Sequence, residues 1–370
     1  MYSSEEIERH RAEAQRIKSA NDEHNRQLTI HAINALGIHD NVLGRKMPAD
    51  IAQSLRIFWI SIHTWVNGFL EPILGSRDVG SNILTDLRRN TGIGKPFYKL
   101  ISNSPDLGRL IRYPDEDYRL LEAVIIRFLV DQIFERGLYD SKSQPGLFLR
   151  KMQDAVSNYI VRRPHGQIMV QLYRAHTYNA LLSLPETETE FWGPYMSKVM
   201  TRLRRLLGCL RAAPHFETYM KSFEAKILPT ARQLHEEMAS SMTRYWFEVE
   251  KFEGTQNREA RIQRLLSNHT GTDLSWRDTY YDIIRAGRVI SIEQVNREEL
   301  YQNLDPLCTI QPRLMMSTLE YDPTTEKVTY KEAVVTTTTN VTAYGDDMER
   351  NTPREAGVSL FWSVCRIVAE

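Results

Sequence analysis

Seven apolar residues between positions 120 and 133 recur at the spacing of one α-helical face, and no other segment constrains the fold as strongly. They are Leu120, Leu121, Val124, Ile125, Phe128, Leu129 and Ile133. The acidic run Asp115 to Asp117 precedes them and Gly137 follows them, as expected at the start and the end of a helix. We therefore expect a helical core built around residues 115–137.

Similar spacing predicts helices along most of the chain. We expect them over 3–36, 48–70, 146–161, 165–184, 190–212, 216–252, 258–268, 273–291 and 296–303, with a kink or break at Pro229 and short helices within 71–114. Residues 308–368 are rich in Thr, Val and Tyr and favour strands, with a loop over 345–353 and a last strand from Val358 to Val368. The predicted fold class is mainly α, a bundle-like multi-helix domain with a small C-terminal β-rich segment.

The same patterns divide the chain into three parts. Residues 1–46 form a polar N-terminal helical arm with a thin apolar stripe. Residues 47–305 form the helical domain, and residues 306–370 form the β-rich segment, which we expect to pack on that domain. A chain of 370 residues is long enough to bury a large core of this kind.

Composition narrows the possible partners and the compartment. The chain has 47 lysines and arginines and 47 aspartates and glutamates, so its net charge is zero and gives no general attraction to nucleic acid. The sequence contains no run of about eighteen apolar residues, so we expect no membrane span. The acidic N-terminus is no secretory signal, and three widely spaced cysteines favour a reducing compartment. We expect an intracellular protein, in cytoplasm or nucleus, whose oligomeric state the sequence leaves open.

One helix combines an apolar face with a basic one. Its basic residues are Lys198, Arg202, Arg204, Arg205 and Arg211, and no acidic residue occurs between Phe191 and Arg211. Such a helix could dock on a protein partner, an anionic membrane or a phosphate backbone. Alternatively, it is an ordinary core helix whose solvated face pairs with acids on its neighbours.

Motifs for catalysis or for cofactors do not fit. The acidic run 115–117 is explained by the helix dipole, and residues 346–350 lack the spacing of a magnesium-binding aspartate cluster. Residues 91–95 contain a Gly-Lys step without the glycine and hydroxyl residue of a phosphate-binding loop. His235 has no second histidine four residues on. We therefore predict no metal site and no cofactor, and we assign no catalytic residue.

Four stretches resemble a set of functionally uncharacterised helical proteins from filamentous fungi. They are residues 47–65, 120–130, 227–246 and 282–287, and the resemblance spans roughly residues 47–320 before a β-rich tail. It implies a fungal source and a helical fold, and it brings no activity, cofactor or site residue with it. The threonine run at 336–339 and the segment 345–353 depart from the pattern.

The leading hypothesis is a non-enzymatic protein-interaction or regulatory protein that uses the basic helix as a docking surface. The alternative is a small-molecule-binding or enzymatic accessory protein of fungal secondary metabolism, with a pocket between helices. A deep pocket with convergent polar groups would favour the alternative. Nucleic-acid binding comes third, because the net charge is zero.

Overall fold

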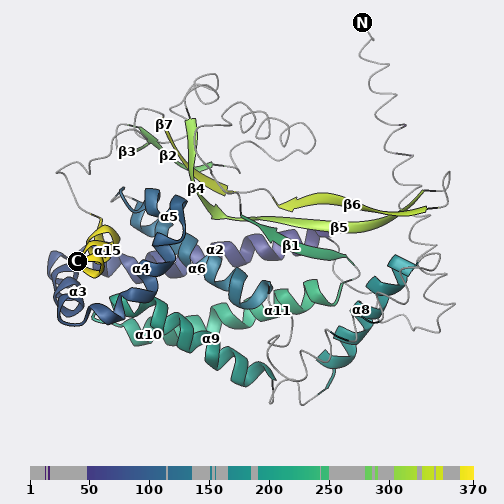
Figure 1. The fold of residues 1–370 in the computed structure, drawn as a ribbon, viewed down its shortest axis with the longest axis horizontal. Helices are drawn as coiled ribbons and strands as arrows, with labels where there is room; N and C mark the ends of the chain where they lie inside the picture. Colours follow the sequence, from purple (N-terminus) through teal and green to yellow (C-terminus); the bar gives the residue numbers. More distant parts are fainter. Residues whose placement is uncertain are drawn as a thin grey trace, which may run out of the picture.

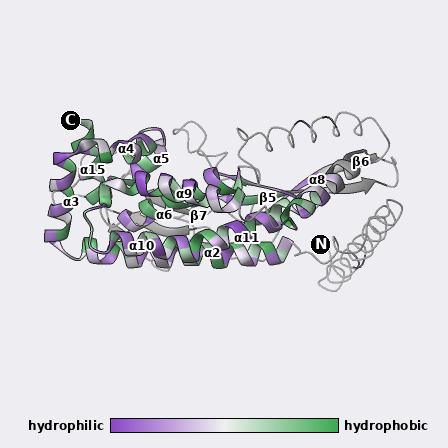
Figure 2. Ribbon diagram, turned by 90° about the horizontal axis from the view of Figure 1, so that it is seen from below, coloured by the Kyte–Doolittle hydropathy of each residue, from purple (hydrophilic) through white to green (hydrophobic). Residues whose placement is uncertain are grey.

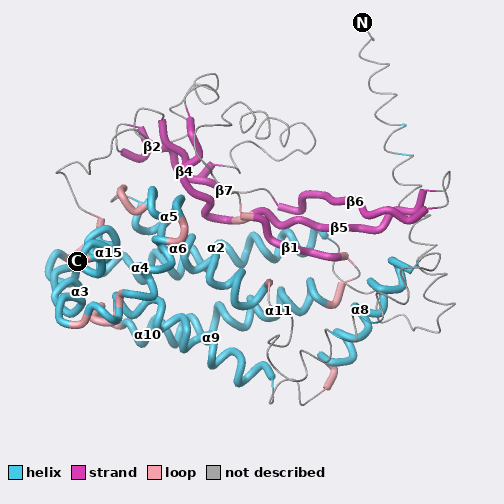
Figure 3. The backbone as a smooth tube through the Cα atoms, in the orientation of Figure 1, coloured by secondary structure: helices cyan, strands magenta, loops and turns pink. Residues whose placement is uncertain are grey.

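The computed structural model shows a layer of helices with β-strands along one side (Figures 1 and 3). It describes residues 48–113, 116–135, 166–184, 191–241, 243–249, 280–285, 288–290, 304–322, 327–336, 339–344 and 359–370, and the single positions 13, 16, 151 and 155. Those single positions apart, the elements predicted over 3–36, 146–161, 258–268, 296–303 and 345–353 lie outside these ranges. Helix predominates in the described part, which confirms the mainly α fold class.

The core is built on two helices that pack against each other. Helix α2 (Pro48–Leu74) buries ten apolar side chains, and α6 (Asp117–Leu129) buries nine of its 13 residues, so α6 lies at the centre of the helical layer. A π-helical turn, η4 (Val130–Phe134), continues α6. Each fully buried large apolar side chain contributes about 1.5–3 kcal/mol. Within the described ranges, no helix is long and apolar enough to cross a membrane.

Short helices connect α2 to α6, as predicted for residues 71–114. They are α3 (Arg77–Arg89), the 3-10 turn η2 (Thr91–Ile93), α4 (Lys95–Ser102) and α5 (Pro105–Leu110). Pro96 and Pro105 stand in the first turns of α4 and α5, where a proline removes no intrahelical hydrogen bond. These prolines let each helix begin in a new direction.

A second series of helices packs against this centre. It comprises α8 (Gly166–Leu182), α9 (Gly193–Leu206), the 3-10 turn η6 (Leu207–Leu210), α10 (Phe216–Ser222), the π-helical turn η7 (Phe223–Ile227) and α11 (Leu228–Ala239). Figure 2 shows polar and apolar residues interleaved along α2, α10 and α11, as in helices with one buried face. Pro229 stands in the first turn of α11, directly after η7, and the helical backbone continues through it.

The strands form two sheets. Strands β1 (Arg244–Glu248), β5 (Arg313–Asp322) and β6 (Lys327–Thr336) make an antiparallel sheet in the order β1-β5-β6. The second sheet has the order β3-β2-β7-β4, from β3 (Arg288–Ile290), β2 (Tyr280–Arg285), β7 (Thr339–Tyr344) and β4 (Leu304–Gln311). In it β2 and β7 run parallel, and the other pairs are antiparallel.

Three sequence-based predictions are wrong. The helix expected to reach residue 252 ends at Ala239, and β1 follows it and pairs with β5. The helix expected over 273–291 contains β2 and β3, because its tyrosines, isoleucines and valine suit a strand once β7 offers a partner. The last strand, expected from Val358 to Val368, is instead helix α15 (Leu360–Ala369).

Helix α15 forms because Ser359 caps its start and its buried residues recur at helical spacing. The Ser359 hydroxyl accepts a hydrogen bond from the Trp362 backbone N–H at 3.1 Å and donates one to Asp117 Oδ1 at 2.5 Å. The Leu360 N–H donates to Asp117 Oδ2 at 2.9 Å. Asp117 belongs to the acidic run predicted to cap α6, and its carboxylate holds the start of α15 against α6.

Close packing between α15 and the short helices depends on Gly94. A Cβ atom at this position would lie 2.6 Å from Val368 Cγ2 and 2.8 Å from Leu87 Cδ1, so no larger residue fits without a shift. Nearby, Phe97 stacks on Phe361 with their ring centroids 5.1 Å apart. The short helices and α15 therefore form one packed unit with the core.

Candidate functional site

A cavity of about 790 Å³ opens between helix α4, the junction of α6 with η4, and helix α9. Ligand-binding pockets typically measure roughly 300–1,000 Å³. Part of its wall is apolar, from Leu100, Phe128, Val130, Leu206 and Val249. The rest is dominated by charged side chains. The polar groups that the alternative hypothesis expects are present, but the pocket is open to solvent rather than deep.

Helix α4 contributes Lys95 and Lys99 to the cavity. They are four residues apart, so they stand one turn apart on the same face of the helix. Phe97 and Ile101 are buried on the other side of α4, which fixes the lysine face toward the cavity and solvent. Neither ammonium group makes an ion pair with any residue that the structure describes.

Helix α9 contributes Arg202 and Arg205, which are exposed, whereas Leu203 and Leu206 beside them are buried. The Arg202 Nη1 donates to Gln132 Oε1 at 2.5 Å. The backbone carbonyl of Gln132 accepts a hydrogen bond from the Tyr195 hydroxyl, so η4 and α9 are joined twice. These bonds hold the Arg202 guanidinium at the cavity wall. Turns of π-helix such as η4 occur often at functional sites.

A fifth basic side chain of the lining, Arg127, is already neutralised. Its Nη1 donates to Asp106 Oδ1 at 3.1 Å, and its Nη2 donates to Asp106 Oδ2. The Nη2 also donates to the Thr309 carbonyl, at 3.0 Å. Burial alone would raise the pKa of Asp106, but the hydrogen bond and charge of Arg127 outweigh burial and hold this pKa below its usual value. The pair therefore joins α5, α6 and β4 and leaves little charge for a ligand.

The three cysteines offer no nucleophile. The Cys308 Sγ lies 3.5 Å from Asp106 Oδ2, and burial raises the pKa of this thiol well above its ordinary value. Burial also raises the pKa values of Cys209 and Cys365 to about 12. A protonated, buried thiol is a poor nucleophile, so these residues act as apolar side chains of the core.

The five residues of the predicted docking surface fall into three groups. Arg202 and Arg205 line the cavity, and Lys198 is exposed on α9 outside the lining. Arg204 lies 3.5 Å from Glu217 and 3.6 Å from Glu224, and Arg211 lies 2.9 Å from Asp86. Arg204 and Arg211 thus pair with acids on neighbouring elements, as the alternative interpretation of this helix expects. Lys95 and Lys99 were not identified from the sequence. The pattern that could have pointed to them is a pair of lysines four residues apart, directly after Gly94.

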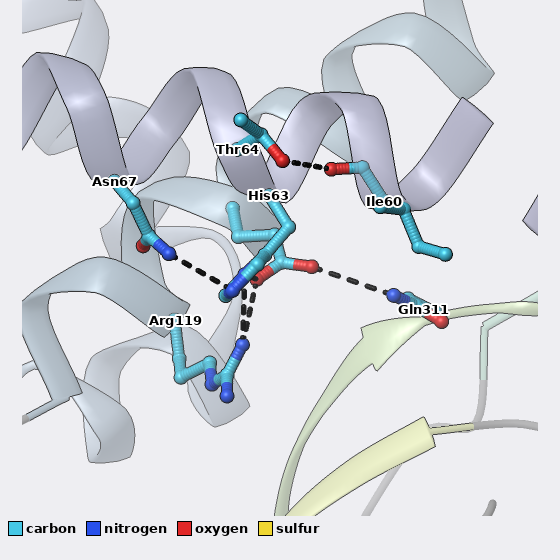
Figure 4. A network of polar contacts seen from close by, with 7 residues as sticks. Ile60, His63, Thr64, Asn67, Arg119 and Gln311 are labelled. Atoms are coloured by element: carbon cyan, nitrogen blue, oxygen red, sulfur yellow. Dashed lines mark hydrogen bonds and ion pairs between the residues drawn. The ribbon is translucent and has the colours of Figure 1, made fainter. Parts of the chain in front are cut away.

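A second polar cluster joins α2, α6 and β4 (Figure 4). Its centre is Glu122, whose side chain is fully buried. The Glu122 Oε2 lies 2.9 Å from His63 Nδ1 and 3.1 Å from Arg119 Nη1, and its Oε1 lies 3.4 Å from the Gln311 amide nitrogen. A buried carboxylate is tolerated only when it is paired in this way.

The second cluster holds helices together, because both ring nitrogens of His63 are occupied. The Asn67 Nδ2 lies 2.9 Å from His63 Nε2, on the side away from Glu122. On the other side, Arg119 Nη1 lies 3.0 Å from His63 Nδ1 as well as 3.1 Å from Glu122 Oε2. Each ring nitrogen therefore already has a partner within the cluster.

Neither cluster resembles a metal centre. In the ranges that the structure describes, no group of three or more His, Cys, Asp or Glu side chains is placed to hold a metal ion. Asp117 of the acidic run binds the start of α15, while Asp115 lies outside those ranges.

Comparison with known proteins adds no assignment. No family model, curated protein or solved structure matches this chain. The resemblance to helical fungal proteins therefore stays a prediction, and the cavity between α4, η4 and α9 is the candidate site on its own geometry.

Proposed function

We propose that this chain binds a small organic anion in the cavity between α4, η4 and α9. The observation that carries the proposal is the presence of Lys95, Lys99, Arg202 and Arg205 on the α4 and α9 walls of one cavity. Within the described residues none of the four is paired with an acid. An anionic ligand would supply the counter-charge, and the apolar part of the wall would cover its body.

The proposal is one of binding, and it corresponds to the small-molecule alternative of the sequence analysis. Arg204 and Arg211 are engaged in intramolecular ion pairs, which leaves a docking role on the basic helix with less support.

The test is titration calorimetry with 1-naphthalenesulfonate, an organic anion with an apolar body. We expect saturable binding to the wild-type protein. The double variant K99Q/R205Q removes one cation from each helix and should weaken binding at least tenfold, about 1.4 kcal/mol or more.

A matched control removes the same charge elsewhere. K198Q/R56Q also replaces one lysine and one arginine, both exposed and both outside the cavity lining. We expect this control to bind like the wild type. Equal binding by wild type, control and K99Q/R205Q would show that the cavity is not the binding site.

A further inference from the structure

We propose that the ligand is an organic molecule with a single phosphate group, which Lys95, Lys99, Arg202 and Arg205 hold through its terminal oxygens. This inference rests on the proposed function and adds the charge, the number of anionic groups and the nature of the body. It is argued below from the charge balance of the cavity, the placement of its two acids and its apolar wall.

The charge balance of the cavity matches a dianion. With Arg127 neutralised by Asp106, four cations remain in the lining against two carboxylates, those of Asp131 and Glu135. Asp131 also has interactions of its own, so the lining carries an excess of at least two positive charges. A phosphate monoester carries about −1.5 to −2 charges at pH 7, whereas a carboxylate or sulfonate carries one negative charge.

The types of side chain also suit phosphate. A guanidinium group can donate two parallel hydrogen bonds to two phosphate oxygens, and an ammonium group acts as a compact positive charge. The cavity provides two of each, and Gln132 already fixes Arg202 at the wall. A phosphate monoester offers three terminal oxygens to these groups, whereas a carboxylate offers two.

The two acids limit the ligand to one anionic group. Asp131 lies in η4 and Glu135 directly follows it, so both carboxylates belong to the same wall. A second phosphate that approached this wall would be repelled by these carboxylates. The lining therefore disfavours polyphosphates and nucleic-acid backbones, in which negative charges follow one another.

The apolar wall indicates an organic body. Leu100, Phe128, Val130, Leu206 and Val249 line the remainder of a cavity of about 790 Å³, which is far larger than a phosphate ion. Burial of an apolar body against these side chains contributes about 25 cal/mol per Å² of surface removed from water. Inorganic phosphate alone would leave this wall uncovered.

The test compares probes that share one body. Titration calorimetry at about pH 7.5, above the second phosphate pKa of about 6, would use 1-naphthyl phosphate, 1-naphthalenesulfonate, inorganic phosphate and tripolyphosphate. We expect 1-naphthyl phosphate to bind at least tenfold more tightly than each of the other three. At about pH 5, where the phosphate loses one negative charge, its advantage over the sulfonate should shrink.

The outcomes separate the two proposals. If phosphate and sulfonate bind equally and K99Q/R205Q weakens both, the cavity binds organic anions and the phosphate assignment is wrong. Tighter binding of tripolyphosphate than of 1-naphthyl phosphate would refute the single-phosphate assignment. If no probe binds the wild type, or if K99Q/R205Q binds all of them unchanged, both proposals are wrong.

Discussion

The buried histidine of α11 should make the stability of this protein depend on pH. His235 is 5% exposed and packs between rings, with Phe134 and Trp192 centroids 6.3 and 6.2 Å from its own. Its Nε2 has no hydrogen-bond partner among the described residues. Burial therefore lowers the pKa of His235 from 6.5 to about 4.

The size of the effect follows from this difference in pKa. Between about pH 6.5 and 4 the unfolded chain binds a proton at His235 and the folded chain does not, so the free energy of unfolding falls as the pH falls. A gap of roughly 2.5 pH units, at about 1.4 kcal/mol each, gives a loss of about 3–4 kcal/mol. This contribution is fully present above pH 6.5 and is lost by about pH 4.

Urea unfolding followed by circular dichroism at several pH values would measure the effect in the wild type and in H235L. Leucine keeps the apolar contacts and cannot titrate. Between pH 6.5 and 4, the free energy of unfolding of H235L should therefore fall by about 3–4 kcal/mol less than that of the wild type. The lowered pKa of Asp106 also reduces the free energy of unfolding in acid, but it does so equally in both proteins.

A control replaces an exposed histidine in the same way. H215N removes an exposed histidine in the left-handed region, where asparagine is tolerated, and should keep the pH dependence of the wild type. The reasoning would be refuted if wild type and H235L lost the same free energy of unfolding between pH 6.5 and 4.

Three further contacts of the fold can be tested by substitution. R119Q leaves the fully buried carboxylate of Glu122 without its arginine and should cost roughly 3 kcal/mol in urea unfolding. R119Q/E122Q should be more stable than R119Q, and an equal or lower stability would contradict this. G94A should destabilise by about 1–3 kcal/mol through its clash with α15, whereas G80A, with nothing within 4 Å, should stabilise α3 by about 0.5–1 kcal/mol. If G94A and G80A changed the melting temperature in the same direction, the close contact at Gly94 would be contradicted. D117A removes two hydrogen bonds to the start of α15 and should cost about 2 kcal/mol, with faster amide exchange in α15. Unchanged exchange there would show that the carboxylate does not hold the helix.

The long helices could be predicted from the sequence because each shows its buried face directly. Residues 120–133 carry apolar side chains at helical spacing over more than three turns, and in α6 and η4 the structure buries all seven of this face except Phe128, which lines the cavity. The short elements are different. Residues 280–285 and 360–369 are both short and apolar, and such segments are ambiguous between strand and helix. Pairing with β7 decides the first, and the cap at Ser359 decides the second.

The candidate site could be predicted only in part. The sequence shows Arg202 and Arg205 on a basic helix, because that helix has no acidic residue in its basic stretch. It does not show that Lys95 and Lys99 share a cavity with them, since about 100 residues separate the two pairs. It also does not show which cations are neutralised, because Asp86 and Asp106 reach Arg211 and Arg127 only after folding.

The packing of α15 has a consequence for the order in which this protein folds during synthesis. Val368 and Leu87 both approach Gly94, and Phe361 stacks on Phe97, so residues near 90 meet residues near 365. A ribosome makes the chain from the N-terminus, at about 5–20 residues per second. The apolar faces of α3 and α4 therefore remain without their cover for many seconds until α15 has emerged. This part of the core can therefore close only after the C-terminal residues have been made.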